Sequence, residues 1–176
     1  ILSDRNMDKD HAPIPSLLAA SGLNHYLIQK GLRNSVGIIV ESGEIREVMH
    51  FSLLVGFGVD AVCPYLAFST VTNLALDGLL DNEVSPELAI DNYINAVKKG
   101  LLKTISRMGI STIHSFFQSQ IFEAIGIDKK VVDTYFFGTA SRIGGIGLEE
   151  IAQEANQRHK KGFPQGHVKI SRIMNV

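Results

Sequence analysis

Residue types that carry acid–base or nucleophilic chemistry occur in pairs directly after short segments with strand-like sequences. In folds with parallel strands, functional groups gather where strands end and helices begin. Their chemistry would be proton transfer, nucleophilic attack or the binding of an anion. The candidates by this criterion are Asp4 and Arg5, Glu41 and Ser42, Cys63 and Tyr65, and His114 and Ser115.

The segment Glu41-Ser42-Gly43 has the composition of a turn that could bind an anion before a helix. Exposed backbone N–H groups at such a turn can hold a phosphate. The negative charge of Glu41 opposes that role because it would repel the phosphate. We therefore interpret this segment as a helix cap with an ion-paired glutamate.

The stretch 58–62 is similar to the last strand of phosphate-binding barrels, in which a glycine-rich turn follows and its N–H groups hold the phosphate. Here Cys63-Pro64-Tyr65 follows instead. Pro64 has no N–H to donate, and the Tyr65 ring would fill the space that a phosphate needs. The sequence therefore predicts a ligand site that is absent or closed.

The remaining candidates have structural interpretations that we favour over catalytic ones. Cys63 could act as a nucleophile beside a base, but a small buried side chain is the better interpretation. His114, at a predicted strand end, is the best catalytic candidate, yet a core or interface histidine is favoured. Asp4 and Arg5 are interpreted as an ion pair that holds a loop rather than as an acid–base couple.

Common cofactor and metal motifs are missing from the sequence. The glycines of residues 138–147 could hold an anion beside Arg142, but they do not form GxGxxG, and a flexible loop is favoured. No GxxxxGK[ST] phosphate loop occurs, and no two histidines have the i, i+4 spacing with an acid between that a helical metal site needs. The single cysteine, Cys63, excludes an internal disulfide and a cysteine-ligated zinc or iron–sulfur site made by this chain alone.

Composition and charge exclude several classes of protein. The 176 residues are 45% hydrophobic and 20% charged, with a net charge of −1, which argues against a dedicated nucleic-acid or anionic-membrane binder. No apolar run reaches the length of about 18 residues that a membrane span needs. The chain starts at Ile1 without a signal-type segment, so we expect it to begin inside a longer polypeptide. A lone thiol favours the cytoplasm.

Predicted strands and helices alternate along the chain. The tail after residue 162 is expected to be irregular, and residues 138–147 are expected to be a loop or a strand with a loop. The alternation predicts an α/β fold with parallel strands, and the few strands indicate a partial or degenerate (β/α) barrel-like unit. We expect strands over 1–3, 36–40, 60–62 and 110–113, and helices over 16–30, 44–55, 66–80, 86–108, 118–125, 129–135 and 148–159.

Several longer runs resemble the large subunit of glutamate synthase, in order along nearly the whole chain. A match of this extent is far more specific than any single motif. The runs are LSDR (2–5), HAPIPSLLA (11–19), VESGEIREV (40–48), GFGVDAVCPYLAF (56–68), KGLLK (99–103), MGIST (108–112) and GTASRI (138–143).

The resemblance implies that residues 1–82 form the C-terminal part of the family's central domain and residues 83–176 a lead-in segment of its synthase (FMN) domain. It implies an enzyme that converts glutamine and 2-oxoglutarate into two glutamates, with ammonia passing through an internal channel. Electrons arrive through FMN and an iron–sulfur cluster. The implied partners are the glutamine amidotransferase and FMN domains of the same polypeptide.

None of the family's catalytic, cofactor-binding or metal-binding residues can be carried onto this chain. The family's amidotransferase uses an N-terminal cysteine where this chain has Ile1, and Cys63 alone cannot ligate a cluster. The resemblance places the FMN-binding strands beyond Val176. We therefore expect a non-catalytic scaffold that binds no cofactor, located in the cytoplasm or, for a plant-type parent, in a plastid.

Two other functions stay open on the residues alone. One is a stand-alone small (β/α) barrel-type enzyme or phosphate-ligand-binding domain, in which Glu41, His114 and the segment 138–147 converge in one pocket. The other is an interaction module without an enzyme context. The open strand edges of a partial barrel would also allow a homo-oligomer.

Overall fold

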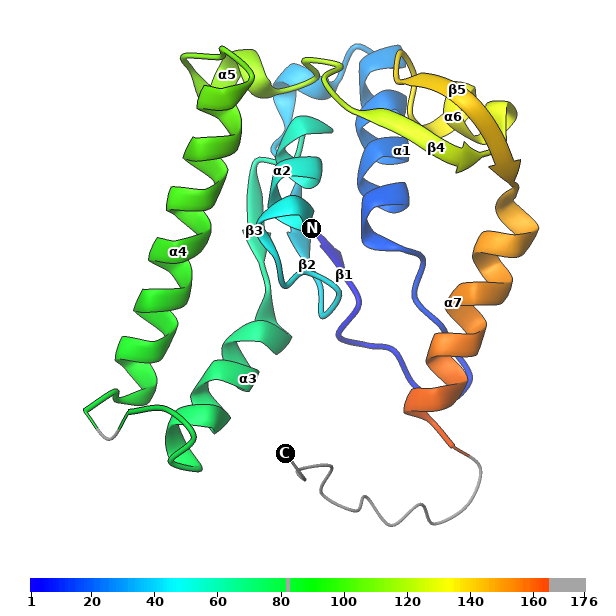
Figure 1. Ribbon diagram of the computed structural model, residues 1–176. Helices are drawn as coiled ribbons and strands as arrows, with labels where there is room; N and C mark the ends of the chain where they lie inside the picture. Colours follow the sequence, from blue (N-terminus) through cyan, green and yellow to red (C-terminus); the bar gives the residue numbers. More distant parts are fainter. Residues whose placement is uncertain (82, 165–176) are drawn as a thin grey trace.

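The computed structural model describes residues 1–81 and 83–164. Figure 1 shows the long helix α4 on one side of the molecule and α7 on the opposite side, with the strands between them. The elements are β1 (Leu2–Ser3), α1 (Ser16–Gln29), the 3-10 helix η1 (Arg33–Ser35), β2 (Ile39–Glu41), α2 (Val48–Gly56), β3 (Ala61–Cys63), α3 (Tyr65–Leu76), α4 (Pro86–Arg107), α5 (Ile113–Phe116), β4 (Glu123–Ile127), α6 (Lys129–Tyr135), β5 (Ala140–Ile146) and α7 (Leu148–Gly162).

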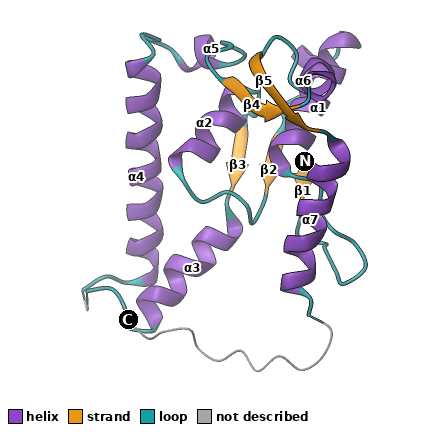
Figure 2. Ribbon diagram, turned by 45° about the vertical axis from the view of Figure 1, so that its right-hand side comes forward, coloured by secondary structure: helices purple, strands orange, loops and turns teal. Residues whose placement is uncertain are grey.

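Three short strands form a parallel sheet in the order β1-β2-β3. Leu2 lies opposite Val40, and Val40 lies opposite Val62. Parallel strands need a crossover connection, which α1 supplies between β1 and β2, and α2 between β2 and β3. Within the described residues the strands do not close into a ring (Figure 2). The expected α/β fold with parallel strands is confirmed, as an open unit rather than a closed barrel.

The main core lies between this sheet and helices α1 and α2. Tyr93 and Val97 of α4 also pack against it, which joins α4 to the first part of the chain. The buried apolar side chains of this core come from α1, β2, α2 and the residues beside them: Ala20, Ile38, Val40, Ile45, Phe51, Leu54 and Val59.

Helix α4 begins where its sequence predicts. The hydroxyl of Ser85 accepts a hydrogen bond from the backbone N–H of Leu88 at 3.2 Å, and Pro86 occupies the first turn. In the middle of the helix, a Cβ added at Gly100 would lie 2.4 Å from Cγ2 of Val48. The absence of a side chain at Gly100 therefore lets α4 approach α2 closely.

A second, two-stranded parallel sheet pairs β4 with β5, with α6 between the two strands in sequence. Val132 and Phe136 of this region form a buried cluster with Leu17 of α1 and Phe57. The hydroxyl of Ser21 on α1 also donates a hydrogen bond to the carbonyl of Tyr135. These contacts attach the second sheet to the first through α1.

Two predicted elements are wrong. Residues 110–113 do not form a strand, because Gly109 takes a φ of 72° and the N–H of Ile110 bonds back to Ile105 at 3.2 Å, closing the end of α4. Residues 118–125 do not form a helix, because Gln118 and Gln120 have φ values of 55° and 53°, outside the helical range. Strand β4 starts at residue 123 instead.

Other predictions differ only in their limits. The predicted helix over 44–55 starts later, at Val48, because Glu47 and His50 form a capping box there. Residues 138–147 contain strand β5, in agreement with the strand-plus-loop alternative. The tail expected to be irregular lies outside the described residues from 165 onward.

A hydrogen-bonded arginine holds the amino ends of β2 and β3 together. The Arg33 guanidinium, whose side chain is 18% exposed, donates to Oδ1 of Asn24 at 2.7 Å and to Oδ2 of Asp60 at 2.9 Å. It also donates to the carbonyls of Val36 and Gly58, each at 2.7 Å. Charge-assisted bonds of this kind are stronger than neutral ones. Arg33 therefore fixes the amino ends of the strands, opposite to the carboxyl ends that carry Glu41 and Cys63.

The approach of α4 to α2 is tested by Gly100→Ala. A helix gains about 1 kcal/mol from such a change where there is room, but here the new methyl group meets the stiff side chain of Val48. We expect a net loss of about 1–3 kcal/mol in the free energy of unfolding, measured with urea. The control is Gly162→Ala in α7, where an added Cβ meets nothing within 4 Å. Equal or greater stability of the Gly100 variant would contradict the packing.

Candidate functional site

The carboxyl ends of β1, β2 and β3 bring together most of the residues singled out by the sequence. The parallel register aligns Ser3, Glu41 and Cys63, so that these residues and the ones that follow them lie at the same edge of the sheet. The N–H of Ser42 donates to the carbonyl of Cys63 at 3.1 Å, which extends the ladder by one residue. The group that meets there consists of Asp4, Arg5, Glu41, Ser42, Cys63 and Tyr65.

The carboxylate of Asp4 binds the turn that follows β2. Its Oδ2 accepts hydrogen bonds from the hydroxyl of Ser42 at 2.6 Å and from the N–H of Gly43 at 3.0 Å. Ser42 is buried, at 1% exposed, and its Oγ accepts the N–H of Glu44 at 3.1 Å. Asp4 therefore bonds the Gly43 N–H that an external anion at this turn would need.

Glu41 is paired with Arg5 rather than left to repel a ligand. Its Oε1 accepts from Nε of Arg5, and its Oε2 accepts from the hydroxyl of Ser3 at 2.7 Å. The Ser3 hydroxyl, followed by the Arg5 guanidinium, holds the pKa of the Glu41 carboxyl below its usual value. The expected ion-paired glutamate is present. The expected pair of Asp4 with Arg5 is not formed, because Asp4 bonds to the turn after β2 and Arg5 bonds to Glu41, the last residue of β2.

Tyr65 covers this turn from the start of α3. Its hydroxyl lies against Gly43, where an added Cβ would be 3.2 Å from it. The Arg5 guanidinium carbon lies 4.2 Å from the centre of the Tyr65 ring, a cation–π contact. Burial first, and then the neighbouring Asp4 carboxylate, raise the pKa of Tyr65 to about 12. The Tyr65 side chain is thus a neutral phenol that covers the turn at Gly43.

The groups proposed for a stand-alone enzyme do not meet. Glu41 lines a small cavity with Leu2 and Val40, whereas His114 lies on α5, with its ring 6.0 Å from that of Phe117. Cys63 is partly buried, and its Sγ lies 4.0 Å from Oε1 of Glu41, a carboxylate that is already bonded to Arg5. This arrangement does not favour a nucleophile with an activating base.

Within residues 1–81 and 83–164, no three His, Cys, Asp or Glu side chains are grouped so that they could hold a metal ion. None of the helices in these ranges has both the length and the apolar character needed to cross a membrane.

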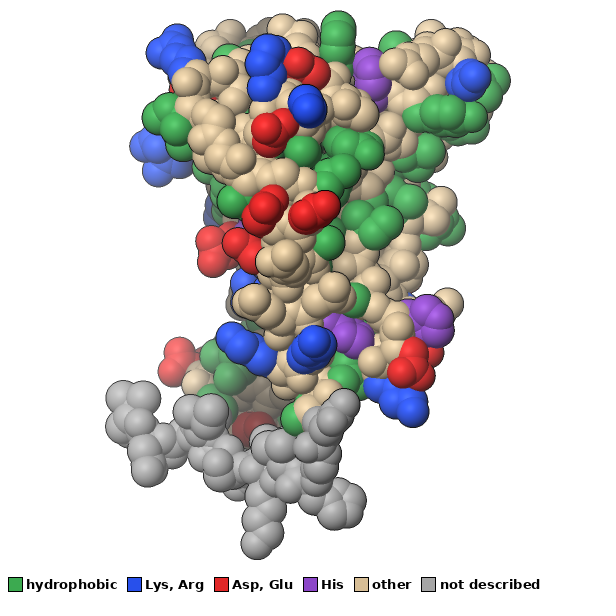
Figure 3. Space-filling model, turned by 90° about the vertical axis from the view of Figure 1, so that its right-hand side faces the viewer, with side chains coloured by type: hydrophobic (Ala, Val, Ile, Leu, Met, Phe, Trp, Pro, Cys, Tyr) green, Lys and Arg blue, Asp and Glu red, His purple; other side chains and the backbone are tan. Residues whose placement is uncertain are grey.

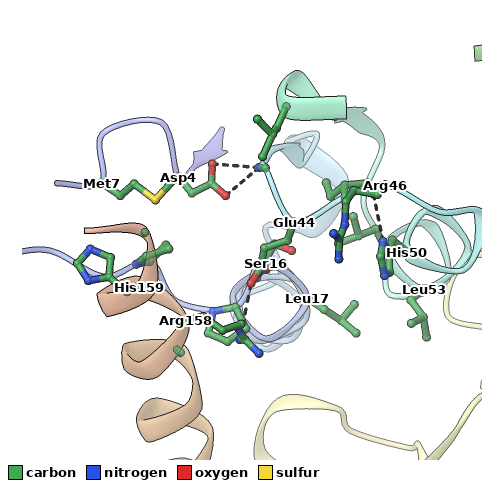
Figure 4. Close-up of a pocket in the computed structure, with 18 of the residues that line it drawn as sticks. Asp4, Met7, Ser16, Leu17, Glu44, Arg46, His50, Leu53, Arg158 and His159 are labelled. Atoms are coloured by element: carbon green, nitrogen blue, oxygen red, sulfur yellow. Dashed lines mark hydrogen bonds and ion pairs between the residues drawn. The ribbon is translucent and has the colours of Figure 1, made fainter. Parts of the chain in front are cut away.

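A larger cavity that the sequence analysis missed lies beside this group. It has a volume of about 690 Å³ and lies between α1, the segment that leads into α2, and α7 (Figure 4). Asp4 and Gly43 form part of its wall, and Arg158 and His159 of α7 form another part. Its lining comes from segments up to about 160 residues apart, and no local sequence signal could have revealed it.

Residues 1–128 match the family described as the glutamate synthase central domain. The chain is 50% identical over 169 residues to the glutamate synthase [NADPH] large chain of Bacillus subtilis (strain 168), covering 96% of this chain and 11% of that protein. It is 45% identical over 164 residues to the glutamate synthase [NADH] of Schizosaccharomyces pombe, covering 93% of this chain and 8% of that protein.

A third relative is the chloroplastic ferredoxin-dependent glutamate synthase of Oryza sativa subsp. japonica. The identity is 38% over 179 residues, covering 96% of this chain and 11% of the rice protein. The chain thus spans about a tenth of the length of the curated relatives it matches.

The closed turn is tested by titrating Tyr65. We expect the phenol, followed by NMR of the labelled ring, to lose its proton at about pH 12, compared with about pH 10 in the chain unfolded by urea. Because the folded pKa is the higher one, this contribution to stability is complete below about pH 10 and is lost as the pH rises towards 12. Tyr65→Phe should remove that pH dependence. Titration of the folded chain near pH 10 would show that Tyr65 is solvated and the turn open.

Proposed function

The chain belongs to the glutamate synthase central-domain family, and we propose that it is a non-catalytic scaffold within a glutamate synthase large chain. In this proposal it lies between the glutamine amidotransferase domain and the FMN-binding domain of the same polypeptide. The parent enzyme makes two L-glutamate from L-glutamine and 2-oxoglutarate, and ammonia moves between the two sites through an internal channel. The role of this segment is to keep those sites at a fixed spacing.

One observation carries the proposal: the carboxyl ends of the strands, where a catalytic or phosphate-binding group would be expected, are bonded internally. Asp4 binds Ser42 and Gly43, and Glu41 is paired with Arg5. Groups that are already bonded to each other cannot easily hold an external anion, since displacing them leaves buried polar atoms without partners. These bonds join the ends of β1 and β2. The bond from the Ser42 N–H to the Cys63 carbonyl and the contact of Arg5 with Tyr65 add β3 and the start of α3, as a spacer requires.

The cofactors of the proposed parent are supplied by other parts of it. An iron–sulfur cluster needs several cysteine ligands, and Cys63 is the single cysteine of this chain. The proposal therefore assigns FMN and the cluster to segments outside this chain, together with the amidotransferase nucleophile.

The division of the chain at residue 82 stays a prediction. It separates a central-domain part, 1–82, from a lead-in to the synthase domain, 83–176, and the family match runs across it to residue 128. Helix α4 packs on the core of the first part through Tyr93 and Val97. We therefore include α4 in the scaffold. We also propose the cytoplasm as its location, or the plastid in a plant-type parent, since the rice relative is named chloroplastic.

The scaffold role is tested in a full-length large chain that carries Arg33→Ala. Loss of the four Arg33 hydrogen bonds should lower the free energy of unfolding of this segment by about 2–3 kcal/mol. We expect several-fold more ammonia to escape into solution per glutamine hydrolysed. Glutamate synthesis from added ammonia should remain close to that of the unsubstituted chain, because no reacting group has been removed.

The matched control is Arg107→Ala, which changes an exposed arginine in the last turn of α4. It should leave both the ammonia escape and the stability unchanged. If Arg33→Ala instead abolished synthesis from added ammonia, or destabilised the segment without any ammonia escape, the scaffold proposal would be wrong.

A further inference from the structure

The 690 Å³ cavity has the size and the wall of a small-molecule site. Pockets for small ligands commonly enclose about 300–1,000 Å³ and are mostly apolar with a few polar groups. Figure 4 shows Arg158 entering from α7, Arg46 coming from the segment that leads into α2, and His50 coming from the first turn of α2. Much of the apolar part of the wall is contributed by Leu17, Leu53, Leu54, Leu66 and Phe163.

The two carboxylates in the wall already have partners. Asp4 is bonded to Ser42 and Gly43, as described above. Oε2 of Glu44 accepts the N–H of Ser16 at 2.9 Å, and its Oε1 lies 3.9 Å from Nη2 of Arg158. These negative charges would disfavour an anion that carries more than one charge in the cavity.

The cationic side of the cavity has spare donors. Within residues 1–81 and 83–164, the guanidinium of Arg46 makes no hydrogen bond or ion pair, and the contact of Arg158 with Glu44 is long. Nδ1 of His50 accepts the backbone N–H groups of Arg46 at 3.1 Å and Glu47 at 3.3 Å. A neutral His50 ring therefore carries its proton on Nε2, which makes that atom a donor as well.

The basic side of the cavity continues along the end of α7. Acidic residues occupy the first turn of α7 and basic residues its last turn: Glu149, Glu150, His159, Lys160 and Lys161. In the view of Figure 3 a group of red side chains lies near the middle of this face, and blue and purple side chains, with some red ones, lie below it. The end of α7 that reaches the cavity is therefore the end that carries the basic side chains.

We propose that this cavity binds a monocarboxylate with an apolar chain, a role that goes beyond the scaffold function and does not depend on it. The carboxylate bonds to the guanidinium groups of Arg46 and Arg158, with the His50 N–H as a further donor. Guanidinium–carboxylate bonds are the strong, charge-assisted kind. The apolar chain lies along the leucine wall, where its removal from water favours binding.

The test uses octanoate as the probe and the 176-residue chain as the protein. Titration calorimetry should show saturable binding at one site. Two matched ligands divide the interaction into its parts: 1-octanol has the chain without the charge, and acetate has the charge without the chain. Each should bind at least about tenfold more weakly than octanoate, because each loses one class of contact.

The variants Arg46→Gln and Arg158→Gln should each weaken octanoate binding about tenfold. Arg107→Gln, at the end of α4, is the matched control and should bind as the unsubstituted chain does. Circular dichroism and urea unfolding establish that each variant is folded; because Arg46 and Arg158 are both exposed, the fold should be unaffected.

Three results would overturn the proposal. The first is no saturable octanoate binding to the folded chain. The second is binding of octanol as tight as that of octanoate, which would indicate an apolar surface that does not recognise the carboxylate. The third is undiminished octanoate binding by both folded arginine variants. None of these results bears on the scaffold function, which is measured by ammonia escape.

Discussion

The carboxylate of Asp4 fixes the turn after β2, and the arrangement at the carboxyl ends of the three strands depends on it. Its bonds to the Ser42 hydroxyl and the Gly43 N–H use donors that face the place where parallel-strand folds hold ligands. With Asp4 in that position, Arg5 turns to Glu41 and stacks over Tyr65, and Tyr65 can pack against Gly43. An internal anion thus takes the role that an external one would have.

A second set of bonds holds the opposite end of the same sheet. Arg33 joins Asn24, Asp60 and the carbonyls of Val36 and Gly58, which precede β2 and β3. The strands have only two or three residues each, so their own ladder hydrogen bonds are few. Fixation at both ends makes a short sheet rigid without a closed barrel, and a rigid, internally satisfied unit suits a spacer between two reaction sites.

The sequence predicted the elements that are determined locally. Ser85 and Pro86 mark the start of α4 because a capping hydroxyl and a fixed φ act within one turn. The failures have backbone or long-range causes. The positive φ values of Gln118 and Gln120 exclude the helix that their neighbours favour, and these values are set by the surrounding chain rather than by glutamine itself.

The candidate group was predictable because parallel strands bring their carboxyl ends to one edge, but its pairings were not. Asp4 and Arg5 are adjacent in sequence, yet they do not pair with each other. Each bonds instead to residues about 36–39 positions away. Arg33 and the larger cavity gave no local signal, since their contacts cross several segments. The family resemblance identified the context that these residues by themselves could not.

The most direct test is an NMR titration of the backbone N–H signals of Ser42 and Gly43 with inorganic phosphate and then with FMN. If Asp4 and Tyr65 close the turn, both signals keep their positions at all concentrations that leave the chain folded. Saturable shifts of these two signals, with an affinity in the micromolar range, would show that the turn binds an anion and would contradict the account.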